Sequence, residues 1–238
     1  MRLDLALVQR GIARSRTHAS TLIAEGRVLV DGVAATKPSQ QVGDDSLLSA
    51  EADRWVSRAA HKLIGALDET GLQIHGRVLD AGASTGGFTQ VCLERGAELV
   101  YAVDVGHDQL ASQLRGDERV NVAEGRNLRD LTMADVGGTP VDMVVCDVSF
   151  ISLRLILPRL LGVLADQGDA MLLVKPQFEV GRELLGNGGV VRDPAQRVAA
   201  VDAVSALGKA LGWRERWRGQ SRLPGAAGNL EFFVWLTR

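Results

Sequence analysis

The chain has 238 residues, of which 46% are hydrophobic and 24% charged, and its formal net charge is −2. This size is enough to bury one α/β core with a small module beside it, and no apolar run approaches the roughly 20 residues of a membrane-spanning helix. Asp4 and Arg10 interrupt the short apolar stretch at the N-terminus, so we expect no secretory signal, a cytoplasmic protein and no membrane partner.

The N-terminal residues predict two short helices and a hairpin. The first helix covers Leu3–Arg10 and is stopped by Gly11. The second begins near Ser15, a residue type that caps helix N-termini, and is stopped by Gly26. A β-hairpin follows, with Asp31-Gly32 as its turn. We therefore expect a small α+β module at this end of the chain.

Positive charge is concentrated in the same segment. Residues 1–30 hold five arginines against two acidic residues, so the remainder of the chain is net acidic. Arg14 and Arg16 fall at the start of the second helix, where side chains and backbone amides can hold phosphates together. The alternative is a solvated helix end with scattered arginines.

About the first fifty residues resemble the S4 RNA-binding module. The resemblance is carried by Arg2-Leu-Asp4-x-x-Leu-Val, Arg14-Ser-Arg16 and Ile23-x-x-Gly26-x-Val28-x-Val30-Asp31-Gly32. It implies binding of structured RNA, with contacts from Arg2, Arg14, Arg16 and Arg27. Because the stretch has no aromatic stacking platform, we expect recognition of RNA shape and backbone rather than of splayed bases.

The boundary of this first domain is expected near residue 53. A polar run over residues 38–46 carries a turn and leads to the final small strand. We expect an S4-like domain over residues 1–53, a linker over 54–57 and a second domain over 58–238. Trp55 is either a linker aromatic packed between domains or simple core filling.

From residue 57 onward, helical and strand patterns alternate, as a doubly wound parallel α/β sheet requires. The predicted strands cover residues 77–81, 99–103, 120–123, 141–147 and 170–175. The clearest predicted helices cover residues 155–164 and 194–211. Residues 213–217 and 231–236 predict a closing antiparallel pair.

A glycine-rich turn after the strand 77–81 predicts a cofactor site. Gly82, Gly86 and Gly87 let the backbone approach a ligand at a helix N-terminus, and Asp104 follows the next strand, where a carboxylate can accept ribose hydroxyls. The spacing is not G-x-G-x-x-G, and Asp80 precedes the first glycine by two positions, which suits S-adenosylmethionine. A plain tight turn is the alternative. The predicted cofactor-binding residues are Asp80, Gly82, Ala83, Ser84, Thr85, Gly86, Gly87, Phe88, Asp104, Asn127 and Asp147.

Charged residues stand at the ends of other predicted elements. Asp147 and Lys175 end neighbouring apolar strands, where burial is costly unless the charges are paired or used. Lys62 lies early in an amphipathic helix, and Glu231 begins the last strand. Taken singly, each has a structural explanation as a surface charge, a helix cap or a salt-bridge partner.

Together these residues belong to motifs that resemble the TlyA family over essentially the whole chain. The motifs are Ser57-Arg-x-x-x-Lys62-Leu, Asp80-x-Gly-Ala-Ser-Thr-Gly-Gly-Phe-Thr89, Asp147-Val-Ser-Phe-Ile-Ser152, Val174-Lys175-Pro-Gln-Phe-Glu179, Gly188-Gly-Val-Val-Arg-Asp193 and Gly228-Asn-x-Glu231-Phe. The resemblance implies an S4 domain followed by a Rossmann-like, FtsJ-like class I methyltransferase domain with an antiparallel last strand. It also implies 2′-O-methylation of cytidine in ribosomal RNA or ribosomal subunits, with Lys62, Asp147, Lys175 and Glu231 as the catalytic tetrad. Asn187 departs from the family pattern, in which lysine is common at this position.

The tetrad suits this reaction, because a ribose 2′-hydroxyl is a weak acid that must be positioned and must lose its proton. Lys175 is the expected group nearest the hydroxyl. It acts either as a neutral base, favoured by the second ammonium of Lys62, or as a charged group that only steers a lone pair. Asp147 would orient the lysines, and Glu231 would fix Lys62 or the ribose.

Other chemistries and functions fit less well. Amino-group methylation would require an Asn/Asp-Pro-Pro-aromatic turn where Asp147 stands, and strand alternation points Cys146 away from that site, which argues against cytosine C5 methylation. The two cysteines and the scattered histidines predict no disulfide framework and no metal. The alternatives are a non-enzymatic ribosomal RNA-binding assembly factor and a hemolysin-like membrane-active protein. Because the chain resembles the short TlyA form without terminal extensions, we expect large-subunit (23S) rather than small-subunit RNA as its substrate.

Overall fold

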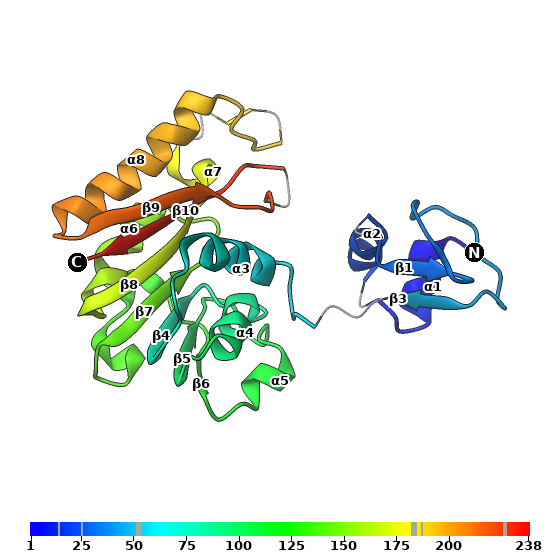
Figure 1. Cartoon of the computed structure of the whole chain (residues 1–238), viewed down its shortest axis with the longest axis horizontal. Helices are drawn as coiled ribbons and strands as arrows, with labels where there is room; N and C mark the ends of the chain where they lie inside the picture. Colours follow the sequence, from blue (N-terminus) through cyan, green and yellow to red (C-terminus); the bar gives the residue numbers. More distant parts are fainter. Residues whose placement is uncertain (14, 25, 51–53, 182–184, 187, 226–227) are drawn as a thin grey trace. The chain divides into compact units, whose positions relative to one another are not determined.

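The computed structural model describes every residue except 14, 25, 51–53, 182–184, 187 and 226–227 (Figure 1). It divides the chain into two compact units, Met1–Arg54 and Trp55–Arg238. Arg14 and Asn187, both singled out from the sequence, lie outside the described residues.

The first unit is a small α+β domain. Two helices pack on a three-stranded antiparallel sheet in the order β2-β1-β3. The elements are α1 (Leu3–Gln9), α2 (Arg16–Ala24), β1 (Val28–Val30), β2 (Val33–Ala34) and β3 (Leu48–Ala50). Its core holds the fully or almost fully buried side chains of Leu3, Leu7, Leu22, Ile23 and Val28.

Local signals in the first unit are placed as the sequence predicted. The Ser15 hydroxyl accepts a hydrogen bond from the backbone N–H of His18 at 3.2 Å, which is the capping contact expected at the start of α2. Asp31 and Gly32 both have positive φ, 52° and 82°, as a two-residue turn of the primed type requires between β1 and β2.

The second unit is built on a seven-stranded sheet in the order β6-β5-β4-β7-β8-β10-β9. The strands β6, β5, β4, β7 and β8 run parallel, and β10 is antiparallel to both β8 and β9. The predicted parallel sheet with a closing antiparallel pair is therefore confirmed. The strands are β4 (Arg77–Ala81), β5 (Leu99–Val103), β6 (Val120–Ala123), β7 (Val141–Cys146), β8 (Leu164–Val174), β9 (Arg214–Gln220) and β10 (Phe232–Thr237).

Helices cover both faces of this sheet (Figure 1). Side chains of α3 and α4 pack on one face against Val78 and Phe233, whereas those of α6 and α8 pack on the other against Leu79 and Val234. The helices of this unit are α3 (Ala59–Thr70), α4 (Gly87–Glu94), α5 (Ser112–Arg115), α6 (Leu153–Gly162), α7 (Pro176–Glu179) and α8 (Pro194–Ala210), with short 3-10 turns η1 (Leu128–Asp130) and η2 (Met133–Val136). Successive residues of each buried strand therefore enter different cores, as strand alternation requires.

The largest difference from a predicted strand range is at the start of β8. β8 begins at Leu164 rather than at residue 170, because Leu164 already pairs with Val141 and Asp169 pairs with Thr237 of β10. The prediction rested on apolar runs and therefore missed this extension, because residues 166–169 are not apolar. No helix in the described part of the chain is both long enough and apolar enough to cross a membrane.

Candidate active site

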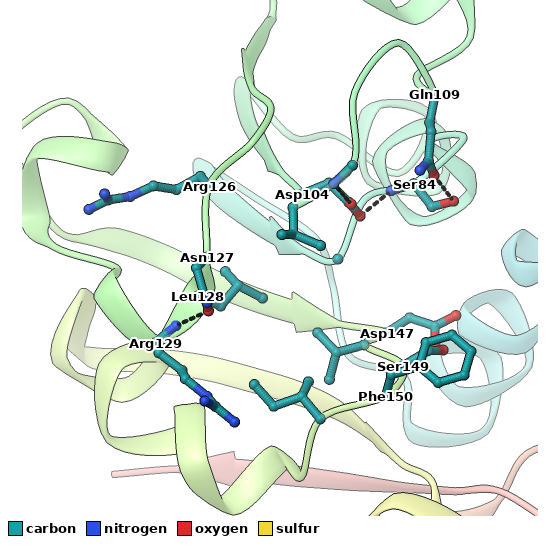
Figure 2. Close-up of a pocket in the computed structure, with 15 residues that line it drawn as sticks. Ser84, Asp104, Gln109, Arg126, Asn127, Leu128, Arg129, Asp147, Ser149 and Phe150 are labelled. Carbon is teal, nitrogen blue, oxygen red and sulfur yellow. Dashed lines mark hydrogen bonds between the residues drawn. The ribbon is translucent and has the colours of Figure 1, made fainter.

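A pocket of about 580 Å³ opens at the carboxyl ends of β4, β5 and β7 (Figure 2). The chain order of the strands reverses between β4 and β7, and open α/β sheets bind their ligands at such a switch point. The residues that line the pocket are Gly82, Ser84, Asp104, Val105, Gly106, Gln109, Arg126, Asn127, Leu128, Arg129, Asp147, Val148, Ser149, Phe150 and Ile151.

The glycine turn after β4 brings two backbones close together. Gly82 has φ +89°, and a Cβ at this position would lie 2.7 Å from the backbone carbonyl oxygen of Asp147. Any side chain would collide with the backbone that follows β7, so only glycine allows the two segments to approach this closely. Gly86, with φ +95°, then forms the N-terminal cap position of α4.

Asp104, directly after β5, binds the glycine turn through its carboxylate. Its carboxylate accepts hydrogen bonds from the backbone N–H groups of Ser84 at 2.9 Å and Gly106 at 2.7 Å. The Ser84 hydroxyl donates to the side-chain oxygen of Gln109 at 3.0 Å, and Figure 2 shows these contacts side by side. The carboxylate is thus fixed at the pocket by backbone donors from two loops.

Asp80 is placed differently from the other predicted cofactor residues. It is fully buried, its Oδ2 accepts a hydrogen bond from the Thr89 hydroxyl at 2.6 Å, and its Oδ1 has no hydrogen-bond partner among the described residues. Burial raises its pKa to about 7; the Thr89 hydrogen bond opposes this shift, and the charge of Asp147 adds to it.

The predicted cofactor residues therefore fall into two groups. Gly82, Ser84, Asp104, Asn127 and Asp147 line the pocket. The others belong to the end of β4, to the turn or to the first residues of α4, outside the pocket lining: Asp80, Ala83, Thr85, Gly86, Gly87 and Phe88.

The four predicted catalytic residues form two ion pairs. Lys62 of α3 and Glu231, which precedes β10, have Nζ and Oε2 2.6 Å apart, with side chains only 6% and 2% exposed. Lys175, directly after β8, and Asp147, directly after β7, have Nζ and Oδ1 2.6 Å apart. Each charge in this enclosed region is therefore compensated by its partner.

Strand alternation places these groups on one side of the sheet. Asp147 and Lys175 lie two residues beyond Val145 and Leu173, whose side chains pack in the core with α3 and α4. Glu231 pairs with Lys62 of α3 itself. Cys146, by contrast, is buried in the core with α6 and α8, and burial raises the pKa of its thiol, which leaves the thiol protonated and a poor nucleophile.

Three supporting contacts were not predicted from the sequence. The Ser149 hydroxyl accepts a hydrogen bond from Lys175 Nζ at 2.8 Å. Asn229 accepts one from Val191 N–H at 2.9 Å and donates one to the Gly189 carbonyl at 3.0 Å, and so ties the Gly-Gly-Val-Val motif to the segment that carries Glu231. All three contacts involve residues of the motifs quoted above, but their partners are distant in sequence.

Glu179 anchors the segment between β7 and α6. Its carboxylate accepts hydrogen bonds from the Ser152 hydroxyl at 2.6 Å, the Leu153 N–H at 2.5 Å and the Arg154 guanidinium at 3.1 Å. The segment that follows Asp147 is thereby fixed to α7, which begins immediately after Lys175.

Phe150 is a further residue that sequence reasoning missed. It lines the pocket (Figure 2), is 92% exposed and has φ +64°. Its ring centroid lies 5.3 Å from that of Phe178. A bulky residue with positive φ is strained, and such strain is concentrated at functional sites. A solvent-facing ring held in this way is suited to stacking on a flat ligand group.

In the first unit, two predicted RNA-binding arginines share one carboxylate. Arg2 and Arg16 form ion pairs with Asp4 at 3.0 and 2.9 Å, and Asp4 itself is almost completely buried. The hydrogen bond from Arg2 holds the pKa of Asp4 well below its usual range, and Arg16 adds to this effect. Arg27 is partly buried.

Comparisons with known proteins support this division of the chain. Residues 55–238 match the family model of the FtsJ-like methyltransferases, and residues 1–47 match that of the S4 domain. The chain is 51% identical to the 16S/23S rRNA (cytidine-2′-O)-methyltransferase TlyA of Mycobacterium tuberculosis, covering 99% of this chain and 89% of that protein. It is 34% identical to the 23S rRNA (cytidine-2′-O)-methyltransferase TlyA of Campylobacter jejuni, covering 99% of this chain and 98% of that protein.

A solved structure is also similar over the full length. A Streptococcus thermophilus protein described as a candidate hemolysin matches with a TM-score of 0.79 and 39% identity, covering 100% of this chain and 88% of that one.

Proposed function

The chain belongs to the TlyA family, which joins an S4 domain to an FtsJ-like methyltransferase domain, and we propose on this premise that it methylates the ribose 2′-hydroxyl of a cytidine in ribosomal RNA. The observation that carries the proposal is the position of Asp147, which lines the pocket and forms the ion pair with Lys175. A pocket with a cofactor turn is thereby joined to a lysine that can reach an attacking hydroxyl.

The pocket fits S-adenosylmethionine as the cofactor. Its volume of about 580 Å³ falls in the usual range for small-ligand sites, and the Gly82 backbone leaves room where any Cβ would collide. Asp104 would accept the ribose hydroxyls of the cofactor, and Val105 and Leu128 supply apolar surface for its adenine. When bound, the cofactor supplies a methyl group on a positively charged sulfur.

The chain's own residues would position and deprotonate the hydroxyl. Asp147 fixes the Lys175 amine at the end of β8, beside the pocket. If Lys175 is neutral, its Nζ accepts the hydroxyl proton as the oxygen attacks; if it is charged, it donates a hydrogen bond that directs an oxygen lone pair toward the methyl group. The Lys62–Glu231 pair would hold the ribose or support the first pair from α3.

The RNA would be held by both units. The S4 domain supplies Arg2 and Arg16, whose guanidinium groups are pre-positioned by Asp4 and can contact phosphates. Phe150 would stack on a base beside the target ribose, since aromatic side chains bind unstacked bases of any sequence.

Large-subunit RNA is the proposed substrate. Both named TlyA relatives carry 23S rRNA in their descriptions, whereas 16S rRNA is named only for the Mycobacterium tuberculosis protein. A protein that acts on ribosomal RNA is expected in the cytoplasm, in contact with ribosomal subunits.

Mapping of the modified nucleotide tests the proposal. Large and small ribosomal subunits are incubated separately with the protein and labelled S-adenosylmethionine, and both RNAs are then mapped by mass spectrometry. We expect one 2′-O-methylated cytidine in the large-subunit RNA and none in the small. The Lys175→Ala variant should bind the cofactor normally but transfer no methyl group, whereas Lys209→Ala, a matched change at an exposed position of α8, should behave as wild type.

Measurement of RNA binding and of membrane lysis beside this assay separates the rival functions. A protein that binds the RNA but never transfers a methyl group would be the non-enzymatic assembly factor. Lysis of membranes with no transfer would favour the hemolysin-like alternative. Methylation of small-subunit RNA would contradict only the choice of subunit.

A further inference from the structure

Lys175 Nζ lies close to two side-chain oxygens of the segment that follows β7. It lies 2.6 Å from Asp147 Oδ1 and 2.8 Å from the Ser149 hydroxyl oxygen, and Ser149 lines the pocket together with Asp147 (Figure 2). The two residues are two positions apart in one segment, which Glu179 anchors to α7 through the Leu153 N–H and the Arg154 guanidinium. The amine is therefore bound by a fixed pair of oxygens.

The two contacts differ in geometry. Nζ donates a hydrogen bond to the Ser149 hydroxyl, whereas Asp147 Oδ1 is an ion-pair partner that receives no hydrogen bond from the described residues. Ser149 is therefore the contact that fixes the direction of the amine. The direction left for the substrate carries the lone pair in the neutral amine and an N–H in the ammonium.

We propose that Ser149 is a positioning residue for methyl transfer, which with Asp147 aligns the free direction of Lys175 Nζ with the ribose 2′-oxygen. The inference rests on the proposed function. In the neutral case, the 2′-oxygen forms the bond to the methyl carbon, the sulfur retains the electron pair of the broken carbon–sulfur bond, and the hydroxyl proton passes to Nζ. Alignment matters at this step, because small misplacements of a reacting group lower rates strongly.

The role of Ser149 differs from that of a structural hydrogen bond. An alignment defect lowers the turnover of the bound complex and leaves substrate binding unchanged. A loosened segment would also weaken cofactor or RNA binding, because Asp147 and Phe150 of the same segment line the pocket.

The test compares three variants of the full-length protein in the ribosomal RNA assay, with cofactor affinity measured by calorimetry. Ser149→Ala should lower kcat by about 10- to 100-fold, with changes below about threefold in KM for RNA and in Kd for S-adenosylmethionine. Ser149→Thr, which keeps the hydroxyl, should retain kcat within about threefold of wild type. Ser152→Ala is the matched control, because it removes a hydroxyl that binds Glu179 and not Lys175, while Leu153 N–H and Arg154 still hold the segment to Glu179. It should also retain kcat.

Each outcome decides the matter. Three results would overturn the role of Ser149 alone, because in each of them the wild type still turns over. These are near-normal kcat in Ser149→Ala, equal losses in Ser149→Ala and Ser152→Ala, and failure of Ser149→Thr to restore kcat. A wild type that binds cofactor and RNA but transfers no methyl group would overturn the proposed function, and the role of Ser149 with it.

Discussion

Lys62 and Glu231 are 169 positions apart in sequence and form a buried ion pair of 2.6 Å between α3 and the start of β10. Two buried charges compensate each other only while both are present, so removal of one leaves the other without a partner in a poorly solvated site.

The first prediction uses this pair to separate stability from catalysis. Lys62→Met should destabilise the protein by about 3–5 kcal/mol, because Glu231 is left buried and unpaired. The double variant Lys62→Met/Glu231→Leu should recover much of that loss and remain inactive. Urea unfolding and the methylation assay measure both effects. A double variant with substantial turnover would remove this pair from the proposed site.

The second prediction concerns the cofactor carboxylate. Asp104→Asn should weaken S-adenosylmethionine binding by about 1–3 kcal/mol, since the ribose hydroxyls lose a charged acceptor. Asp166→Asn, at an exposed position near the start of β8, is the control and should bind as wild type. Calorimetry on folded protein decides the point. Equal affinities for the two variants would show that Asp104 only stabilises the glycine turn and does not bind the cofactor.

The third prediction concerns the pH dependence of stability. The pKa of Asp80 is about 7 in the folded state against an ordinary value of 3.8, so the folded state binds an extra proton between these values. This group stabilises the fold most fully below pH 3.8, and its contribution is lost as the pH rises through 7. Asp80→Asn should therefore flatten the fall in unfolding free energy over this window, by up to about 4 kcal/mol.

Denaturant unfolding of wild type and Asp80→Asn at several pH values measures the difference curve. Other groups titrate in both proteins and cancel. Parallel curves for the two proteins would mean that Asp80 is ionised in the folded state across the range. Thr89→Val, which removes the hydrogen bond to Asp80, should move the wild-type transition to higher pH, because that bond stabilises the charged form.

The fourth prediction concerns the exposed ring at the pocket. Phe150→Ala should lower kcat/KM for RNA without changing cofactor affinity. The loss should correspond to about 1–3 kcal/mol of transition-state stabilisation, the usual value of one base–aromatic stack. Phe150→Tyr should retain most of the activity, because its ring is kept. If Phe150→Ala behaves as wild type, the strained backbone at this position has another explanation. Leu155→Ala provides a control for loss of an exposed apolar side chain nearby.

The features predicted correctly from the sequence are those whose pattern lies within a few consecutive residues. The ranges of β4, β5 and β6 match their predicted limits, because an apolar run bounded by glycine or charge is a local pattern. The start of β8 was missed, because its polar first half is recruited by pairing with β7 and β10. Side-chain partners such as Ser149 and Lys175 are set by tertiary packing and have no local signature.

The predicted strand ends indicated where the candidate site lies, but not which side chains contact one another there. Asp104 directly follows a predicted strand, and Asp147 and Lys175 are the last residues of two others, so topology alone brought all three to one edge of the sheet. The pairing of Lys62 with Glu231 came from the family resemblance, not from local patterns. Asp80 was expected beside the cofactor. Its carboxyl is fully buried, and this burial depends on tertiary packing that residue spacing does not predict.

The last prediction concerns the arginines of the first unit. Arg2 and Arg16 converge on the buried carboxylate of Asp4, so their charges are held in place before any RNA binds. Arg2→Gln/Arg16→Gln should weaken binding to ribosomal RNA and lower the slope of log affinity against log salt, by about 0.7–0.9 for each phosphate that the variant no longer neutralises. Cofactor binding to the second unit should be unchanged.

Loss of both arginines also leaves Asp4 unpaired, so instability of the first unit is the competing explanation. The Arg2→Lys/Arg16→Lys variant distinguishes the two, because it keeps both charges and removes the forked hydrogen bonds to Asp4. If phosphate charge is what matters, the lysine variant should recover the salt slope while melting at a lower temperature. If both variants bind RNA with wild-type affinity and slope, these arginines serve only to close α1 and α2 around Asp4, and the RNA is held elsewhere.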